Sequence, residues 1–451
     1  MTMRAQVTKG IARTVQKALK RWTSGGTSFP GKLAKTLDPE ILKTLAKDYR
    51  VVIITGTNGK TVTTGLTVNI LRQRYAHVLT NDTGSNMEQG IISTFLQAES
   101  DKKEDKIAVL EVDEASVRHV TRYIQPEVIL TTNLFRDQMD RFGEIYTTFD
   151  YILEGADQVP DTLLMMNGDA PIFSSRAYQH KVSYFGFRNE DKTKDLMAHY
   201  NTDGVLCPNC QHILHYHAIT YSNLGDYFCP NCSFKRPELS YEVERVDELT
   251  TESASFTIEG HTYTIPVAGV YNIYNALAAY SLAKYFGLSQ EEIQEGLGQA
   301  KRIFGRQEKL TLADKDVRIN LIKNPVGFNQ IVSLLALDSE DFSLVILLND
   351  RSADGEDISW IWDGLFEDLV HLSQLRAVTI GGLRRLDLFT RVKVAGYPKE
   401  AIHVVENYPE TLEAIKNMPT QKVYVLATYT AMLGIRRELS DQGLVKERMK
   451  S

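Results

Sequence analysis

The chain has 451 residues, of which 43% are apolar and 24% charged, and its formal net charge is −6. These values are typical of a soluble globular protein of two or three domains, and the acidic balance argues against a nucleic-acid partner. No apolar run is long enough to span a bilayer and no secretory signal is visible, so we expect a cytoplasmic protein with reduced thiols.

A basic segment occupies residues 1–48. No Asp or Glu occurs before Asp38, whereas Arg4, Lys9, Arg13, Lys17, Lys20 and Arg21 do. The stretch from Gly10 to Trp22 can form an amphipathic helix with Ile11, Val15, Leu19 and Trp22 on one face. We favour a helix that packs on its own domain. The alternative is a peripheral contact with the anionic inner face of a membrane.

Buried strands alternate with helices from residue 49 to residue 304. Apolar, β-branched runs predict strands, and helix-compatible stretches lie between them. The strands are expected at Val51–Thr55, Ile107–Val112, Val128–Thr132 and Leu163–Met166, and helices at Thr61–Tyr75 and Ser116–Ile124. This alternation predicts a doubly wound α/β domain.

The same alternation returns in residues 305–451. Strands are expected at Leu344–Leu348, Ala377–Ile380, Ile402–Val405 and Val423–Ala427, and helices at Trp360–His371 and Thr411–Asn417. We therefore predict a second, smaller α/β domain.

A glycine-rich loop, Gly56-Thr57-Asn58-Gly59-Lys60-Thr61, directly follows the first strand and precedes a helix-compatible segment. Glycines let backbone amides approach phosphate groups, and the helix N-terminus adds partial positive charge. We expect the loop to bind ATP, with Lys60 at the β- and γ-phosphates and the Thr61 hydroxyl on Mg²⁺. A plain Gly-rich turn is the alternative, but Gly-Lys-Thr after a buried strand is a specific arrangement.

With Thr55 included, the loop reads TGTNGKT and resembles the phosphate loop of the Mur ligase family, which includes the folylpolyglutamate synthetases. Further segments resemble that family in its own order: Glu111, Thr132-Asn133 with Asp137 and Asp140, Asn167-Gly168-Asp169, Gly269–Ala276, Phe304–Glu308 and Lys323-Asn324-Pro325. The resemblance implies a Mur ligase central ATP-binding domain in which Glu111 binds Mg²⁺, Asn272 lies near the adenine and Arg306 contacts phosphate. The chain departs from the family pattern at Gln138, Tyr271 and Lys323.

All four cysteines belong to one pattern. Cys207 and Cys210 form one C-x₂-C knuckle, and Cys229 and Cys232 form a second after 18 intervening residues. This spacing predicts a structural Zn²⁺ ribbon at about residues 200–237, inserted in the central domain. Two disulfides would conflict with reduced thiols. Because every Cys is committed, no nucleophile remains for hydrolysing glutamine, and a glutamine-dependent reaction would need a separate glutaminase subunit.

The ribbon and the segment Asp354–Trp360 resemble the branch of the Mur ligase family that amidates a carboxylate. The resemblance implies that ATP converts the α-carboxylate of D-glutamate in the lipid II stem peptide to an acyl phosphate, which ammonia from a partner glutaminase turns into D-isoglutamine. It also implies that Asp357 completes the Cys–His pair of that glutaminase across the subunit interface. The residues alone favour a helix N-cap at Asp357, and Asp350, Asp354 and Glu356 are nearby competitors.

Two other functions are compatible with parts of the sequence. A single-subunit ligase of the Mur or folylpolyglutamate type would add an amino acid in place of ammonia, but such enzymes lack the ribbon and the Asp354–Trp360 segment. A ribbon-bearing nucleic-acid-dependent ATPase is disfavoured by the acidic net charge.

Overall fold

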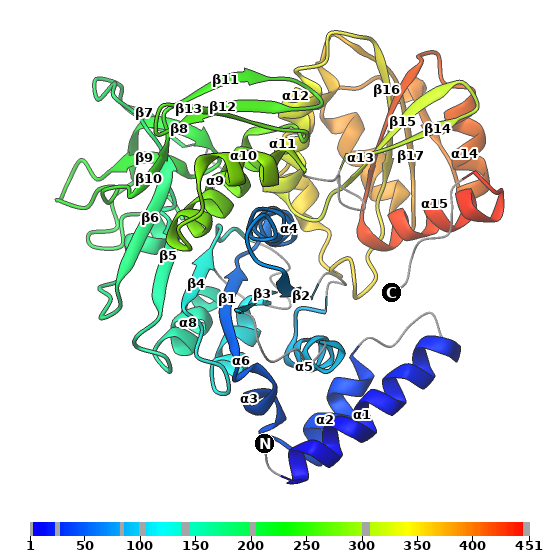
Figure 1. Cartoon of the computed structure of the whole chain (residues 1–451). Helices are drawn as coiled ribbons and strands as arrows, with labels where there is room; N and C mark the ends of the chain where they lie inside the picture. The colour runs from blue at the N-terminus through cyan, green and yellow to red at the C-terminus, as the bar shows by residue number, and fades with distance from the viewer. Residues whose placement is uncertain are drawn as a thin grey trace.

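The computed structural model describes residues 3–22, 28–81, 85–98, 105–136, 145–198, 204–299 and 307–444. Figure 1 shows one α/β unit built around β1 and β4, and a second, coloured yellow to red, built around β15–β17. This arrangement confirms the predicted α/β class. The expected boundary near residue 304 lies outside the described residues.

A seven-stranded parallel sheet forms the first unit, in the order β10-β6-β5-β4-β1-β3-β2. Its strands are β1 (Tyr49–Thr55), β2 (His77–Thr80), β3 (Lys106–Glu111), β4 (Val128–Thr131), β5 (Leu163–Asn167), β6 (Val182–Phe187) and β10 (Tyr241–Val243). The four strands expected from apolar runs are all present. Because the chain leaves β1 for one side of the sheet and later returns to its other side at β4, the end of β1 is a switch point where ligands bind in such sheets.

Helices cover this sheet and place the phosphate loop. They are α4 (Lys60–Leu71), α5 (Glu88–Gln97), α6 (Val117–Val120), α8 (Ile145–Ala156), α9 (Val270–Tyr285) and α10 (Gln290–Gly298). Helix α4 begins at the loop itself and packs against α9 and α10. The helix expected at Ser116–Ile124 is shorter: a 3₁₀ turn (Glu114–Ser116) leads into α6.

Three helices, α1 (Met3–Trp22), α2 (Phe29–Leu37) and α3 (Ile41–Ala46), form the N-terminal part. Helix α1 packs through a different stripe from the one predicted, namely Ala5, Thr8, Ala12 and Gln16, all of them buried. These small and polar side chains let α1 approach its neighbours closely. Met3, Val7 and Ile11 face outward, with 82%, 57% and 44% of their surface exposed, whereas Val15 and Leu19 of the predicted face are half-buried.

Two small antiparallel sheets of three strands each belong to the first unit in addition to its seven-stranded sheet. The first consists of β7 (Leu196–Met197), β8 (His215–Tyr221) and β9 (Leu224–Phe228), with Cys207 and Cys210 before β8 and Cys229 and Cys232 after β9. The second consists of β11 (Arg245–Leu249), β12 (Ala254–Ile258) and β13 (His261–Ile265).

The second unit is a six-stranded sheet in the order β14-β15-β19-β16-β17-β18, parallel except for the β14–β15 pair. Its strands are β14 (Glu308–Leu312), β15 (Lys315–Leu321), β16 (Phe342–Leu347), β17 (Leu375–Gly381), β18 (Ile402–Val404) and β19 (Lys422–Ala427). Its α-helices are α11 (Pro325–Leu335), α12 (Phe366–Val370), α13 (Arg385–Val394), α14 (Tyr408–Lys416) and α15 (Tyr429–Asp441).

The single helix expected at Trp360–His371 is wrong. A 3₁₀ turn (Ser359–Trp362) and α12 replace it. The Arg391 guanidinium donates hydrogen bonds to the carbonyls of Ile361 and Gly364, both at 2.9 Å. In a continuous helix these carbonyls would accept hydrogen bonds from backbone amides of the same helix. A tertiary contact therefore interrupts a locally helical pattern.

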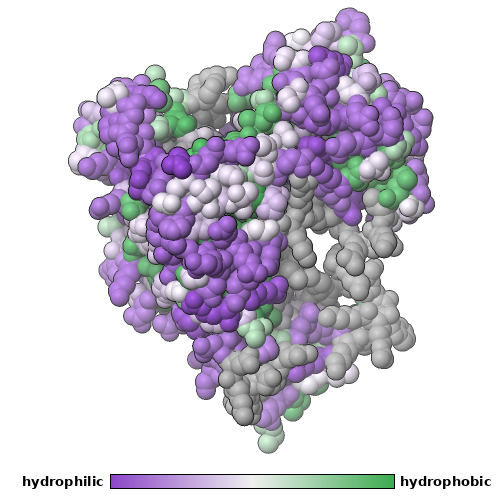
Figure 2. Space-filling model, turned by 45° about the horizontal axis from the view of Figure 1, so that its top comes forward, coloured by the Kyte–Doolittle hydropathy of each residue, from purple (hydrophilic) through white to green (hydrophobic). Residues whose placement is uncertain are grey.

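Among the described residues, no helix is long and apolar enough to cross a membrane. The face drawn in Figure 2 is covered mainly by hydrophilic side chains, with hydrophobic ones in small clusters. Among the described residues on that face, the hydrophobic ones form no broad belt.

Candidate nucleotide and metal sites

The loop between β1 and α4 is held in a shape that only glycine permits at two positions. Gly56 and Gly59 have φ values of 123° and 88°, in the left-handed region. A Cβ atom on Gly56 would lie 2.4 Å from Thr132 Oγ1, and one on Gly59 would lie 2.1 Å from Asn275 Oδ1. The two glycines thus let the loop pass between the segment after β4 and helix α9.

The segment after β4 clamps this loop. The Asn58 amide donates to Asn133 Oδ1 at 2.9 Å, and Asn133 Nδ2 donates back to the Asn58 carbonyl, also at 2.9 Å. The Thr132 hydroxyl donates to the same carbonyl at 2.7 Å, and the Thr57 amide donates to the Asn133 carbonyl at 2.8 Å. The Thr132-Asn133 pair is therefore a support for the loop. Asp137, Gln138 and Asp140 lie outside the described residues.

Lys60, the first residue of α4, forms a largely buried ion pair that the sequence did not indicate. Its Nζ lies 2.9 Å from Glu114 Oε1 and also donates to the Gly56 carbonyl. Burial alone lowers the pKa of Lys60, but the charges of Glu114 and Glu111 outweigh it and raise the pKa above its ordinary value. Burial likewise raises the pKa of Glu114, yet Lys60 holds it below the usual range. Both groups are therefore charged at neutral pH.

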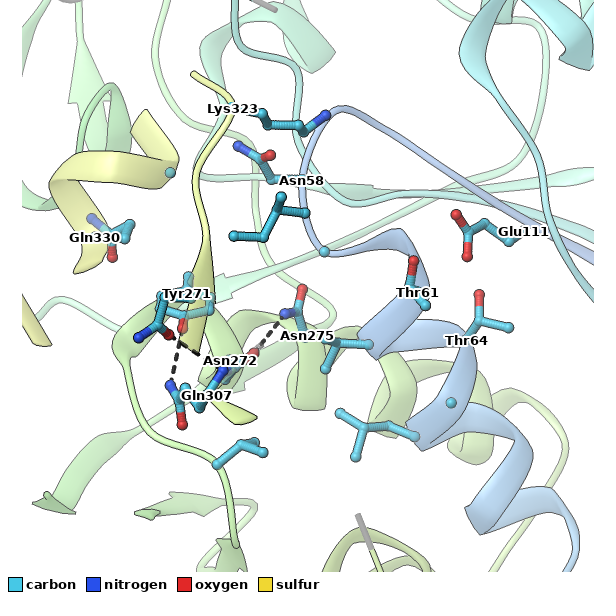
Figure 3. Close-up of a pocket in the computed structure, with 18 of the residues that line it drawn as sticks. Asn58, Thr61, Thr64, Glu111, Tyr271, Asn272, Asn275, Gln307, Lys323 and Gln330 are labelled. Atoms are coloured by element: carbon cyan, nitrogen blue, oxygen red, sulfur yellow. Dashed lines mark hydrogen bonds between the residues drawn. The ribbon is translucent and has the colours of Figure 1, made fainter. Parts of the chain in front are cut away.

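Oxygen donors gather beside this pair. Glu111 ends β3 with only 6% of its surface exposed, and its backbone is fixed by two hydrogen bonds to the side chain of Asn81. Figure 3 shows the Glu111 carboxylate beside the hydroxyls of Thr61 and Thr64, one turn apart on α4. The Thr64 hydroxyl is buried without a hydrogen-bond partner. A carboxylate with two hydroxyls, one of them unpartnered, fits a hard cation such as Mg²⁺.

A cavity of about 460 Å³ opens from the loop toward α9 and the second unit. Tyr271, Asn272 and Asn275 line it from α9, and Gln307 and Lys323 from beyond residue 306. Gln307 is locked to the backbone of Ala268 by hydrogen bonds of 3.0 and 3.1 Å and donates to the Tyr271 hydroxyl at 3.1 Å. Arg306, the predicted phosphate contact, lies outside the described residues.

Side chains from the two units meet across this cavity. Asn324 caps α11 by accepting a hydrogen bond from the Gly327 amide at 2.8 Å. Its Nδ2 donates to Asn58 Oδ1 in the phosphate loop at 3.3 Å. Figure 3 shows Lys323 reaching toward the same loop. The cavity is thus bounded by both α/β units, whereas most of the nucleotide contacts predicted from the sequence lie in the first unit.

The four cysteines converge on one point. All four Sγ atoms lie within 4.8 Å of one another, with 3.5 Å from Cys207 to Cys232 and from Cys210 to Cys229. The thiols are free, so no disulfide links them. A tetrahedral Zn²⁺ with bonds of about 2.3 Å separates its sulfur ligands by about 3.8 Å. The donor set and its spacing therefore fit a closed tetrahedral zinc site.

Asp357 is exposed, between β16 and the turn Ser359–Trp362. Its carboxylate accepts hydrogen bonds from the Ser359 amide at 2.7 Å and from the Ser359 hydroxyl at 3.0 Å. The competitor Asp354 is buried instead, with its carboxylate engaged by the amide of Thr430 at 2.6 Å. Asp350 is paired with Arg384 at 3.1 Å, and Glu356 accepts from the Ser352 hydroxyl at 3.1 Å.

Comparison with known proteins agrees with this fold and loop. The family model of the Mur ligase middle domain matches residues 54–234, and that of the MurT ligase C-terminal domain matches residues 321–432. The pseudomurein peptide ligase type C of Methanothermus fervidus has the same fold, with a TM-score of 0.65 at 20% identity over 90% of this chain and 81% of its own. The protein is a ligase of the Mur type.

Closer relatives narrow the class. The lipid II isoglutaminyl synthase (glutamine-hydrolyzing) subunit MurT of Streptococcus pneumoniae is 46% identical over 424 residues, 94% of each chain. Its namesake from Staphylococcus aureus is 35% identical over 85% of this chain and 86% of its own length. The chain belongs to the MurT family.

Proposed function

We propose that this protein is the synthetase subunit of a lipid II isoglutaminyl synthase and amidates the α-carboxylate of D-glutamate in the lipid II stem peptide. The observation that carries the proposal is the 46% identity, along almost the whole chain, to a protein of that name. The loop from Gly56 to Thr61, its clamp and the buried Lys60 supply the ATP site that such a reaction needs.

The chemistry proceeds in two displacements. The α-carboxylate attacks the γ-phosphorus of ATP, so an acyl phosphate forms and ADP leaves. Ammonia then attacks the activated carbonyl carbon, inorganic phosphate leaves, and the carboxamide remains after loss of a proton. Activation is required because an unactivated carboxylate would have to expel oxide, which is not a viable leaving group, whereas the acyl phosphate expels inorganic phosphate.

Each group of the candidate site then has a role. Lys60 turns from Glu114 toward the β- and γ-phosphates and stabilises the charge of the transferred phosphoryl group. Thr61 and Glu111 would hold Mg²⁺, which would supply positive charge to neutralise the phosphates. Asn272 lies on the adenine side, and Arg306 is proposed as a further phosphate contact.

The four cysteines are proposed to hold a structural Zn²⁺, because a tetrahedral site with four thiolates leaves no open position for catalysis. No cysteine then remains for glutamine hydrolysis. A GatD-type glutaminase in a heterodimer is the proposed ammonia source. Asp357, which is exposed whereas Asp354 is buried and Asp350 is paired with Arg384, is proposed to orient the glutaminase histidine across the interface.

A membrane contact through α1 fits a lipid-linked substrate. The first 37 residues contain eight Lys and Arg and no Asp or Glu, whereas the whole chain is acidic. The outward stripe of Met3, Val7 and Ile11 gives this basic helix an apolar face. We propose that α1 rests on the anionic inner membrane surface, since apolar insertion and attraction to acidic headgroups reinforce each other.

The test is ATP turnover by the full chain with a lipid II substrate and ammonia. We expect turnover only when both are present. In Lys60→Ala it should fall on the order of a hundredfold or more, because an electrostatic contact to the developing charge is lost. Lys43→Ala, an exposed cation on α3, is the matched control and should behave as wild type. Incorporation of a labelled amino acid in place of ammonia would support the single-subunit ligase instead.

A further inference from the structure

The cysteine ribbon contributes a wall to the nucleotide cavity through Tyr221. This residue ends β8, is 8% exposed, and lines the same cavity as Tyr271 and Asn272. Its ring packs against Tyr274 of α9 at a centroid distance of 5.6 Å and against Phe135 at 6.0 Å. Strand β8 follows the Cys207–Cys210 knuckle, so the strand that carries Tyr221 is also attached to the proposed metal site.

A buried carboxylate joins the other side of the ribbon to α9. Asp169 has no exposed surface, and its Oδ1 accepts a hydrogen bond from Arg236 Nη1 at 2.7 Å. Its Oδ2 accepts from the Tyr274 hydroxyl at 2.6 Å and from the Phe187 amide at 2.8 Å. Arg236 follows Cys232 by four residues. A chain of two short contacts therefore runs from the second knuckle to the helix that bears Asn272.

Strand β9 docks on the same turn. The Gly225 amide donates to the Asp169 carbonyl at 3.0 Å, and Asp226 pairs with Arg236 at 3.2 Å. The Arg236 amide donates to the Tyr227 carbonyl at 2.9 Å. The position of Asp169 and the order of β9 therefore depend on each other.

We propose that metal binding by the four cysteines and nucleotide binding in the cavity are linked through Tyr221 and Asp169. The proposal rests on the zinc and ATP sites described under Proposed function. A four-thiolate site orders the chain that supplies it. Ordered β8 keeps Tyr221 in the cavity wall, and ordered Arg236 keeps Asp169 on Tyr274. Metal loss releases the contacts of Tyr221 and Asp169 with Tyr274 of α9. Asp169 and Tyr274 are therefore positioning residues for the nucleotide.

Linkage is reciprocal, which gives two independent measurements on the full chain. The first is the Kd of MgADP for zinc-loaded protein and for protein freed of zinc by a chelator, with circular dichroism to verify that the fold persists. The second is zinc affinity by competition with a chromophoric chelator, with and without saturating MgADP. We expect the same factor in both, at least about fivefold. Equal affinities in both pairs would overturn the linkage, whereas failure of every form to bind MgADP would also reject the proposed ATP site.

Two variants, studied as zinc-loaded protein, test the linkage between zinc and nucleotide binding even if the metal-free protein unfolds. Tyr274→Phe removes the hydroxyl on Asp169, and Arg236→Gln removes its cation. Both should keep one zinc per chain, bind MgADP severalfold more weakly, and reduce the factor by which MgADP tightens zinc. Arg188→Gln is the matched control, because Arg188 pairs with Glu242 at 2.8 Å and Glu244 at 3.3 Å on the surface. Variants that retain the full wild-type factor would contradict the proposal.

Discussion

Lys60 Nζ lies 2.9 Å from Glu114 Oε1, in a pair whose side chains are 12% and 7% exposed. The pair holds the phosphate-loop lysine charged and in place beside the loop. The pKa of Glu114 is lowered, so its stabilising contribution is present above the pKa of an unfolded Glu and is lost as pH falls through the folded value. The pKa of Lys60 is raised, so its contribution is lost only as pH rises through its folded value.

Glu114→Gln should therefore make activity sensitive to alkaline pH. Burial lowers the pKa of Lys60, and the charge of Glu114 counteracts that effect. Without this charge the pKa of Lys60 falls, so the lysine loses its proton at a lower pH. We expect a small loss of turnover at neutral pH that grows as pH rises, measured as a pH profile of kcat/KM. Glu356→Gln, an exposed carboxylate, is the control. A profile that keeps the wild-type alkaline limb would contradict this role.

Asp357→Ala should separate the two nitrogen sources. With glutamine and the partner glutaminase, amide formation should fall on the order of a hundredfold or more, since the glutaminase histidine loses its orienting carboxylate. With high ammonia and no glutamine, much of the activity should remain, because the ATP site is untouched.

Ser359→Ala serves as the matched control for Asp357, because it removes a hydrogen bond at 3.0 Å but keeps the carboxylate. It should behave nearly as wild type with glutamine. An equal loss with both nitrogen sources in Asp357→Ala would point to local unfolding of the Ser359–Trp362 turn and would remove the residue from this role.

Cys207→Ser should lower the melting temperature and the zinc content together. Cys207 is completely buried and is one of four converging thiols, so its loss opens the site and exposes β8 and β9 to unfolding. Metal analysis should find one zinc per chain in the wild type and much less in the variant. A wild-type melting temperature that a reducing agent lowers and a chelator does not would indicate disulfides in place of zinc.

Val7→Glu with Ile11→Glu should weaken membrane attachment. The exposed apolar stripe of α1 gains two charges that oppose insertion and repel anionic headgroups. Co-sedimentation of the full chain should fall with phosphatidylglycerol vesicles and be low throughout with phosphatidylcholine vesicles. Met197→Glu, at an apolar side chain 64% exposed on the ribbon, is the matched control. If the wild-type protein did not co-sediment with phosphatidylglycerol vesicles at moderate salt, the proposed membrane contact of α1 would be refuted.

Much of the fold could be predicted from local pattern. Val51–Thr55, the glycine loop and the helix after it form a contiguous stretch whose residues determine its structure, and the α/β class follows from repetition of that pattern. Contacts between segments far apart in the sequence could not be predicted from local pattern. Glu114 reaches Lys60 only because β3 lies beside β1 and a 3₁₀ turn follows it, and no spacing in the sequence records that arrangement.

The errors have the same origin. Helix α1 packs on its own domain as predicted, but close helix packing puts the small side chains of Ala5 and Ala12, and not Ile11, on the buried face. The helix at Trp360–His371 is broken because Arg391, 30 residues after Ile361 and 27 after Gly364, donates hydrogen bonds to their carbonyls. Tyr221 was not predicted to line the cavity, because its place there depends on how the ribbon docks against Asp169.

The most direct test of the central claim is mass spectrometry of the lipid II stem peptide after incubation with the full chain, ATP and Mg²⁺. With ammonia, or with glutamine and the partner glutaminase, we expect conversion of one carboxyl to a carboxamide, located by fragmentation at the α-carboxylate of D-glutamate and absent with Lys60→Ala. An unchanged peptide under both conditions, or a peptide extended by an amino acid, would contradict it.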